Sequence, residues 1–330
     1  MTVRFGLLGA GRIGKVHARA VTASPDARLV AVADAIAPAA EAIATAYGAE
    51  VRTIDAIAAA DDIDAVVICT PTDTHADLIE RFARAGKAIF CEKPIDLDVA
   101  RVRACLKVVK ATGARLMVGF NRRFDPHFRA LRRAIDDGRI GTVEMVTLVS
   151  RDPGAPPLDY VARSGGIFRD MTIHDFDMAR WLLGEEPVAV SAHAAVLTDP
   201  AIRAAGDFDS ANVLLETASG RQAVITNSRR ATYGYDQRVE VLGSGGMVAA
   251  ENQREVSIEI ADGAGFQRPP LLDFFMTRYT AAYAAEIAAF VAGLRDGTPL
   301  APSGADGLAA LLLADAAVRS VAEGRRIPVG

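Results

Sequence analysis

The chain has 330 residues, too many for one ordinary core, so we expect two domains. Its hydrophobic fraction of 51% and charged fraction of 24% are typical of a globular protein and exclude a disordered one. The net charge of −4 at pH 7 gives no sign of a basic nucleic-acid-binding face, and no apolar run reaches the roughly 20 residues that span a bilayer.

Residues 1–120 alternate short apolar runs, typical of buried parallel strands, with helical patterns of about 10–15 residues. The expected strands are Val3–Leu8, Leu29–Ala33, Ala65–Cys69, Ala88–Cys91 and Leu116–Gly119. The expected helices between them are Arg12–Ala23, Ala37–Tyr47, Asp73–Ala85 and Asp98–Ala111. This alternation predicts an α/β Rossmann domain with a parallel sheet over residues 1–120.

Residues 121–330 have a different pattern, which predicts an α+β domain with a large, mainly antiparallel, open-faced sheet. After a helix at Phe124–Asp137, the expected strands are Thr142–Ser150, Val188–Leu197, Ala211–Glu216, Gln222–Ser228, Arg238–Leu242 and Glu255–Ile260. The proline- and glycine-rich segment 151–166 has the composition of a loop that covers a site. Two alanine-rich helices, Thr277–Leu294 and Ser303–Glu323, end the chain, and the last can pack back on the first domain.

The run GAGRIG after the first predicted strand fits the pattern GxGxxG. Such a pattern is weak alone, but here it follows a strand and opens a helix, which indicates a dinucleotide site. Gly9 permits the tight turn, Gly11 lets the backbone approach a pyrophosphate, and Gly14 lets the helix pack closely on the strand. With Arg12 and Ile13, these glycines offer the free N–H groups of a helix N-terminus to an anion.

Asp34 ends the second predicted strand, 20 residues after Gly14. A carboxylate at this place accepts hydrogen bonds from the adenosine ribose and repels a 2′-phosphate. Because Ala35 and Ile36 follow, no adjacent arginine can hold that phosphate. The sequence therefore predicts NAD rather than NADP, unless Asp34 is only a polar strand end.

The loops CTPTDTH (69–75) and CEKPI (91–95) follow two further strands, where ligands of such sheets bind. His75 either lines the cofactor or simply starts a helix. The full set that we expect to contact the cofactor is Gly9, Gly11, Arg12, Ile13, Gly14, Asp34, Thr70, Pro71, Thr72, His75, Glu92 and Lys93.

The stretch RDMTIHDFDMARW (169–181) concentrates ionisable groups. Asp170 and His174 are four residues apart and would share one face of a helix. A histidine suits the removal of a proton from an alcohol, and a nearby carboxylate orients the ring and stabilises its charged form. The alternative is a satisfied core histidine. Lys93, before a proline that fixes its turn, could bind the oxygen of the same alcohol.

The cysteines Cys69, Cys91 and Cys105 are odd in number and form no CxxC pair. We therefore expect buried free thiols, no disulfide and no metal site. The sequence starts with a strand and shows no leader pattern, which together with the cysteines indicates a cytoplasmic protein.

Six motifs together resemble the glucose–fructose oxidoreductase / inositol dehydrogenase / rhizopine catabolism (Gfo/Idh/MocA) family over nearly the whole chain. They are GAGRIG, CTPTDTH, CEKPI, GFNRRFD, SGGIFRDMTIHDFDMARWL and YGYDQRVEVLGSGGM. The first and third are common to the whole superfamily, whereas the last two are more similar to its bacterial inositol 2-dehydrogenase branch.

The resemblance implies catalysis by Lys93, Asp170 and His174, substrate contacts by the same three residues, and a homotetramer joined through the open sheet face. It adds three substrate contacts, which are Arg122, Asp152 and one tyrosine, either Tyr233 or Tyr235. The implied reaction is the NAD-dependent oxidation of a cyclic polyol, myo-inositol to 2-keto-myo-inositol (scyllo-inosose), without a metal.

Three alternatives remain open at this point. The polyol could be scyllo-inositol, chiro-inositol, glucose, levoglucosan or a galactose derivative. The chain could be a non-catalytic NAD-bound sensor, although such a protein would be expected to lose Lys93 or His174. It could also be a lyase or epimerase that uses NAD for a transient oxidation.

Overall fold

The computed structural model describes residues 2–330 and divides the chain into two compact units. Unit 1 extends to Asp125 and also contains Ala281–Leu311, and unit 2 contains Pro126–Thr280 and Leu312–Gly330. The first division lies slightly beyond the expected boundary at residue 120. The segment 281–311, which we placed in the second domain, groups instead with the first.

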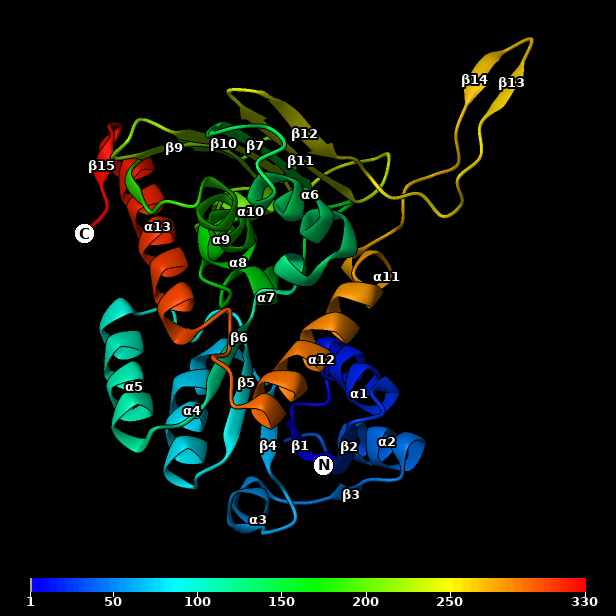
Figure 1. Ribbon diagram of the computed structural model, residues 1–330, viewed down its shortest axis with the longest axis vertical. Coiled ribbons are helices and arrows are strands. Elements are labelled where there is room, and N and C mark those ends of the chain that lie inside the picture. Colours follow the sequence, from blue (N-terminus) through cyan, green and yellow to red (C-terminus); the bar gives the residue numbers. More distant parts are fainter. Residues whose placement is uncertain (1) are drawn as a thin grey trace. The chain divides into compact units, whose positions relative to one another are not determined.

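Unit 1 contains a six-stranded parallel sheet with the order β3-β2-β1-β4-β5-β6 (Figure 1). This is the order of a dinucleotide-binding Rossmann fold, in which the chain reverses direction across the sheet between β1 and β4. The prediction of a Rossmann domain is therefore confirmed. The strands are β1 (Val3–Leu8), β2 (Ala27–Ala33), β3 (Glu50–Val51), β4 (Ala65–Ile68), β5 (Ala88–Glu92) and β6 (Leu116–Gly119).

The helices of unit 1 begin and end where local signals place them. Asp98 caps α5 by accepting a hydrogen bond from Ala100 N, and Gly48 and Gly113 end α2 and α5 in the left-handed conformation. The helices are α1 (Arg12–Ala23), α2 (Ala37–Tyr47), α3 (Ile54–Ala59), α4 (His75–Arg84) and α5 (Val99–Thr112), with short 3-10 turns η1 (Thr72–Thr74) and η2 (Asn121–Phe124).

Helix α12 (Thr280–Asp296) packs on the core of unit 1, which explains why the chain returns to this unit. The ring of Phe290 lies 6.0 Å from that of Phe5 on β1 and 5.8 Å from that of Phe90 on β5. All three rings are fully buried. An alanine-rich pattern predicts such a helix but does not say which sheet it covers.

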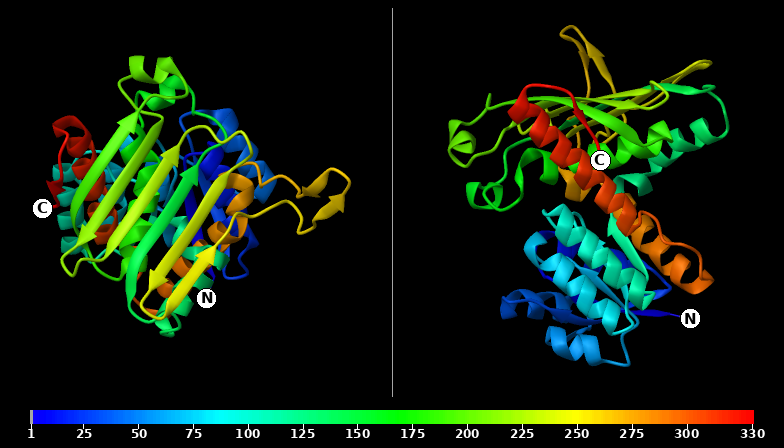
Figure 2. Two further views of the ribbon diagram at one scale, coloured as in Figure 1. Left: turned by 90° about the horizontal axis from the view of Figure 1, so that it is seen from above. Right: turned by 90° about the vertical axis from the view of Figure 1, so that its left-hand side faces the viewer.

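Unit 2 contains a seven-stranded sheet with the order β12-β11-β7-β10-β9-β8-β15. Only the central pair β7/β10 is parallel, so the prediction of a mainly antiparallel sheet is confirmed. Figure 2 shows one face of this sheet without a covering helix. The strands are β7 (Val143–Arg151), β8 (Pro187–Ala195), β9 (Ser210–Thr217), β10 (Gln222–Ser228), β11 (Asp236–Gly243), β12 (Gly246–Ala250) and β15 (Ile327–Pro328).

The other face of the sheet carries α9 (Thr172–Leu183), which contacts β7 and β10. Asp175 of α9 is fully buried and accepts hydrogen bonds from Ser150 Oγ (2.6 Å) and Asn227 Nδ2 (2.8 Å), one from each strand. These bonds fix the helix on the sheet. The remaining helices are α6 (Pro126–Asp136), α7 (Leu158–Val161), α8 (Gly166–Asp170), α10 (Pro200–Ala204), α11 (Phe275–Arg278) and α13 (Gly304–Glu323), which crosses from unit 1 into unit 2.

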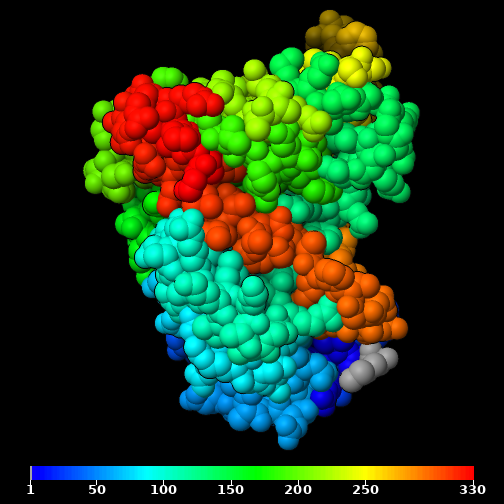
Figure 3. Space-filling view, turned by 60° about the vertical axis from the view of Figure 1, so that its left-hand side comes forward, coloured from blue at the N-terminus to red at the C-terminus, as the bar shows by residue number. Residues whose placement is uncertain are grey.

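The prediction of a strand at Glu255–Ile260 is wrong. The chain instead forms a hairpin of β13 (Ile260–Asp262) and β14 (Gly265–Gln267) that stands clear of the rest of unit 2 (Figure 1). Figure 3 shows this part of the chain as the gold atoms at the top of the view. Its side chains are exposed, so the β-branched residues of this segment have no core to fill.

Among residues 2–330, no helix is long and apolar enough to cross a membrane. Cys69, Cys91 and Cys105 are buried and free, as expected. Burial raises the pKa of the Cys105 thiol to about 12 and holds those of the other two well above their ordinary value. All three therefore remain uncharged thiols near neutral pH.

Asp209 of unit 2 is fully buried and accepts five hydrogen bonds, from Leu197 N, Thr198 N and Oγ1, Asp199 N and Ser210 Oγ. Burial alone would raise its pKa, but these donors outweigh burial and lower the pKa from 3.8 to about 2.

We expect Asp209→Asn to lower the free energy of unfolding by about 2 kcal/mol at neutral pH. Because the folded-state pKa is lowered, this stabilisation is present above the ordinary pKa and is lost as the pH falls from about 4 towards 2. Urea unfolding across this range should show the difference between wild type and variant shrinking. The exposed Asp296→Asn is the control, and a difference that stays constant to pH 2 would contradict the account.

Candidate active site

The glycine turn between β1 and α1 has the geometry that a dinucleotide site requires. Gly9 has a φ of +95°, and a Cβ there would lie 2.5 Å from Cys69 O. A Cβ on Gly14 would lie 2.0 Å from Gly9 O, so only glycine lets α1 start this close to β1. A Cβ on Gly11 would meet no protein atom within 4 Å. Thus two of the glycines serve packing, and the third borders open space, where a ligand can approach.

This contrast predicts different outcomes for two alanine variants. Gly14→Ala should lower the free energy of unfolding by about 1–3 kcal/mol, because the methyl group collides with backbone that has little room to move. Gly11→Ala should leave the thermal midpoint unchanged and weaken NADH binding. Thermal unfolding and fluorescence titration with NADH measure the two effects, and equal stability losses in both variants would contradict the assignment.

Asp34 follows β2 and lies beside the glycine turn. Its Oδ2 accepts a hydrogen bond from Ala10 N at 2.5 Å, and its Oδ1 accepts one from Ile36 N at 2.7 Å. The carboxylate is half-buried. It therefore stands next to the turn, as the predicted contact with an adenosine ribose requires.

The loop after β4 places Thr70, Pro71 and Thr72 at the same carboxyl edge of the sheet, and Thr70 Oγ1 lies 2.7 Å from Thr74 Oγ1. His75 is the first residue of α4 and is 2% exposed. Its Nδ1 lies 2.8 Å from Pro94 O and its Nε2 lies 2.8 Å from Thr70 O. Both ring nitrogens thus face backbone carbonyls, so the predicted contact with the cofactor would come from the carbon atoms of the ring.

Lys93 follows β5 directly and is half-buried. The neighbouring strand β6, which pairs Gly119 with Glu92, leads to the buried Arg122 in η2. Lys93 and Arg122 therefore belong to adjacent strand ends at the edge that also carries the glycine turn. Glu92 is buried with its Oε1 2.6 Å from His17 Nε2, so its carboxylate is directed into the protein.

In unit 2, the expected residues gather at the carboxyl ends of the parallel pair β7/β10. Asp152 follows β7, and its backbone N–H donates to Ser228 O at the end of β10. Arg229 follows β10 and is 1% exposed. Its Nη2 lies 3.6 Å from Asp170 Oδ2 and 3.3 Å from Asp207 Oδ2.

Asp170 is held from two sides. Tyr160 OH donates to its Oδ1 at 2.8 Å, and Arg229 lies next to its Oδ2. Asp207 in turn accepts a hydrogen bond from Ile167 N in α8, which fixes the short helix that carries Asp170. Tyr160 comes from the segment 151–166, so this predicted loop contributes a direct contact to the site.

We expected Asp170 and His174 to share one face of a helix. In the structure they lie on two separate helices. Helix α8 ends at Asp170, Met171 separates the helices, and α9 starts at Thr172. Separate contacts hold the two helices: Asp207 accepts from Ile167 N in α8, and Asp175 of α9 accepts from the two sheet strands. Within residues 171–180, every residue except the half-buried His174 is buried. This position suits a histidine that meets a ligand better than a core histidine.

Of the two candidate tyrosines, Tyr233 is exposed and Tyr235 is buried. Tyr233 OH donates to Asp236 Oδ2 at 2.6 Å and accepts from Arg151 Nη1 at 2.9 Å. Partial loss of water around its hydroxyl, followed by the hydrogen bond to Asp236, raises the pKa of Tyr233. Tyr235 packs edge-on against Phe274 and Tyr279. Neither arrangement selects one of them as a substrate contact.

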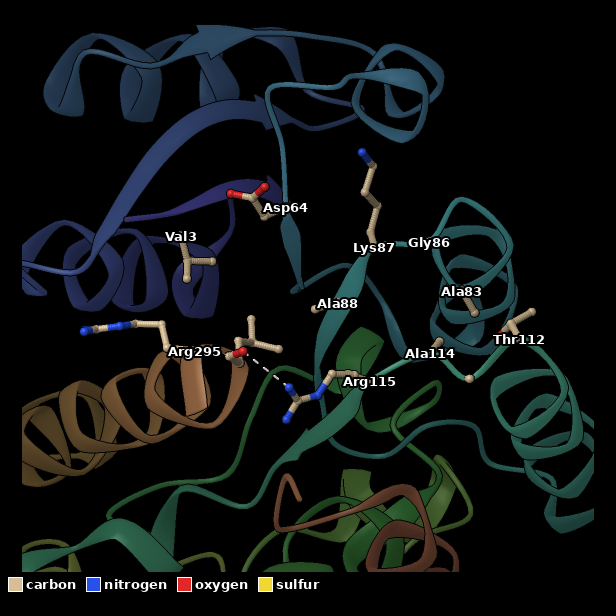
Figure 4. A pocket seen from close by; sticks show the side chains of 12 residues that line it. Val3, Asp64, Ala83, Gly86, Lys87, Ala88, Thr112, Ala114, Arg115 and Arg295 are labelled. Carbon is tan, nitrogen blue, oxygen red and sulfur yellow. Dashed lines mark hydrogen bonds between the residues drawn. The ribbon is translucent and has the colours of Figure 1, made fainter. Parts of the chain in front are cut away.

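A separate hollow of about 310 Å³ lies at the opposite, amino edge of the unit 1 sheet (Figure 4). Val3 and Ala88, which begin β1 and β5, line it. Its cations already have partners: Lys87 donates to Ala60 O and Ile63 O, Arg115 to Gly293 O, and Arg295 pairs with Asp26. It offers none of the chemistry gathered at the carboxyl edge.

Family models match both parts of the chain. Residues 3–120 match the oxidoreductase family with an NAD-binding Rossmann fold, and residues 128–249 match the GFO/IDH/MocA C-terminal domain. The chain belongs to the GFO/IDH/MocA oxidoreductase family. It is therefore an NAD-dependent oxidoreductase, and the glycine turn, the open space at Gly11 and the carboxylate of Asp34 fit NAD.

Individual members of the GFO/IDH/MocA family are similar over the full length. The inositol 2-dehydrogenase of Rhizobium meliloti (strain 1021) is 78% identical over 329 residues, which cover 100% of both chains. The crystal structure of a myo-inositol dehydrogenase from Corynebacterium glutamicum is 45% identical with a TM-score of 0.97, covering 100% of this chain and 99% of that one. The scyllo-inositol dehydrogenase of Lactobacillus casei, solved with NAD(H) and scyllo-inositol, is 29% identical with a TM-score of 0.93, covering 100% and 99%.

The sequence of this GFO/IDH/MocA member did not indicate several residues of the candidate active site. They are Tyr160, Asp207 and Arg229 around Asp170, and His17 against Glu92. Arg229 is one of two adjacent arginines in a turn, a position that usually indicates solvent exposure. His17 lies on the apolar, buried face of α1. A histidine on such a face was the one feature of the sequence that could have indicated a buried polar contact.

Proposed function

We propose that the protein oxidises a ring hydroxyl of myo-inositol to the ketone 2-keto-myo-inositol, with NAD as the oxidant. The observation that carries this substrate is the 78% identity, over the full length of both chains, with the inositol 2-dehydrogenase of Rhizobium meliloti. The polar groups at the carboxyl ends of β7 and β10 suit a substrate whose surface is covered with hydroxyls.

In this proposal His174 accepts the hydroxyl proton, while Asp170 orients the ring and stabilises its charged form. Tyr160 and Arg229 hold both oxygens of Asp170, which keeps that carboxylate in place. Lys93 binds the reacting oxygen with its charge, and this favours the neutral, proton-accepting form of the histidine. NAD, when bound, accepts the hydride that leaves the ring carbon. Arg122, Asp152 and one of Tyr233 and Tyr235 bind the other hydroxyls.

The test is the absorbance of NADH after purified protein is mixed with NAD and one polyol at a time. We expect a rise with myo-inositol and a much smaller one when NADP replaces NAD, because Asp34 repels the 2′-phosphate. Chromatography of the product against authentic scyllo-inosose confirms the position of oxidation. The absence of a rise with every polyol, in protein shown to bind NADH, would overturn the proposal.

Scyllo-inositol is the second candidate substrate. The likeness to the Lactobacillus casei enzyme solved with this isomer favours it. The two isomers differ in the orientation of one hydroxyl, so a comparison of kcat/KM for both under the same conditions separates them. A higher value for scyllo-inositol would retain the mechanism and change the substrate.

We further propose a cytoplasmic homotetramer. The open face of the unit 2 sheet supports the assembly, because it exposes the apolar side chains of Met145, Val224, Leu242 and Met247. Light scattering on the eluting protein measures its mass, and a monomeric mass would contradict the tetramer. Fractionation of cells that express the protein tests its location.

A further inference from the structure

Lys93 lies between two residues that are each held by a buried histidine. On one side, the Glu92 carboxylate lies 2.6 Å from His17 Nε2. On the other side, the Pro94 carbonyl lies 2.8 Å from His75 Nδ1. His17 is 0% exposed and His75 is 2% exposed, so both contacts are protected from water.

The two histidines come from α1 and α4, the helices that follow β1 and β4 at the carboxyl edge of the unit 1 sheet. His17 lies in α1, which begins directly after the glycine turn. His75 begins α4, and its Nε2 also lies 2.8 Å from Thr70 O in the loop after β4. The Lys93 turn is thereby joined to the segments that we assign to cofactor binding.

The imidazole rings of His75 and His17 each have few N–H groups or polar contacts. Burial, the largest influence, lowers the pKa of His75, so the ring is neutral near pH 7 and carries one N–H for two carbonyl oxygens. His17 Nδ1 is buried and has no hydrogen-bond partner among residues 2–330, so the contact with Glu92 is the one polar contact of that ring. Phe90 and Tyr283 pack against the ring with centroids 5.0 and 5.4 Å away.

We infer that His17 and His75 are positioning residues for Lys93. They hold the residues before and after the lysine, and so fix the direction in which its long, flexible side chain leaves the turn. This inference rests on the proposed function, in which Lys93 binds the reacting oxygen. A catalytic group displaced by about 1 Å can cost about 100-fold in rate.

The test uses two substitutions of His75, each of which preserves one of the two contacts of its ring. In His75→Asn, the amide nitrogen occupies the place of Nδ1 and can still donate to Pro94 O. In His75→Gln, the amide nitrogen occupies the place of Nε2 and can donate only to Thr70 O. We expect a 10- to 100-fold lower kcat for the glutamine variant and a loss of less than threefold for the asparagine variant, with NADH affinity within twofold of wild type in both.

Two substitutions test His17 in the same way. His17→Leu should lower kcat by the same 10- to 100-fold, and His17→Gln, which keeps a donor for Glu92, should recover most of that loss.

His193→Gln is the matched control, because His193 is exposed on β8 in unit 2. A second measurement does not depend on turnover: the acetylation rate of Lys93 relative to the exposed Lys110, followed by mass spectrometry. This ratio should change in His75→Gln and not in His75→Asn. Equal effects of the two variants on kcat and on the ratio would overturn the inference. Wild-type protein that oxidises no polyol, while the Lys93 ratio still changes as expected, would instead contradict only the proposed function.

Discussion

Replacing Lys93 with methionine is expected to lower kcat for polyol oxidation by about 10²- to 10⁴-fold, the range typical of a group that assists proton transfer. Methionine preserves the length and apolar part of the side chain but removes the charge that binds the reacting oxygen. Because the glycine turn and Asp34 are unchanged, NADH binding should weaken far less than kcat. Steady-state rates and a fluorescence titration with NADH measure the two quantities.

The matched control for this substitution is Lys110→Met, which removes an exposed lysine from the last turn of α5. It should turn over at the wild-type rate. If Lys93→Met kept more than a tenth of the wild-type kcat, Lys93 would not be part of the chemistry, and the sensor interpretation would gain support.

Replacing His174 with glutamine should also lower kcat by about 10²- to 10⁴-fold near neutral pH, since the amide cannot accept the hydroxyl proton as the imidazole does. The loss should become smaller as the pH rises, because hydroxide can then remove that proton. Rates of wild type and variant between pH 6 and pH 10 show this convergence. A loss that does not depend on pH would indicate that His174 positions the substrate and does not take its proton.

The sequence predicts the Rossmann half of the fold well because its signals are local. Apolar runs bounded by glycines place β1 and β6 with their observed bounds, and GAGRIG places the cofactor turn. The second half is harder, because antiparallel strands pair by long-range contacts that periodicity does not encode. The stretch Glu255–Ile260 has the composition of a strand, yet it does not pair with the seven-stranded sheet. It leads instead into the exposed hairpin of β13 and β14.

The site shows the same division between local and long-range information. Lys93, Asp170 and His174 stand in short motifs whose residue types indicate their chemistry. The groups that hold them come from far along the chain: Arg229, which follows β10, pairs with Asp170, and His17 in the first helix contacts Glu92. His75 illustrates the limit most clearly: the sequence predicts a cofactor contact or a helix start at this residue, but it does not predict that the ring meets Pro94 O and Thr70 O.

The central claim is that the protein moves a hydride from the ring carbon of an inositol to NAD. The most direct measurement incubates the wild-type protein with NAD and myo-inositol that carries deuterium at C2, followed by mass spectrometry of the reduced cofactor. The account predicts one deuterium per molecule of NADH formed, together with a slower turnover than with unlabelled substrate. Reduced cofactor without deuterium would place the oxidation at another carbon, and product formation without any release of NADH would support the internal-redox lyase or epimerase instead.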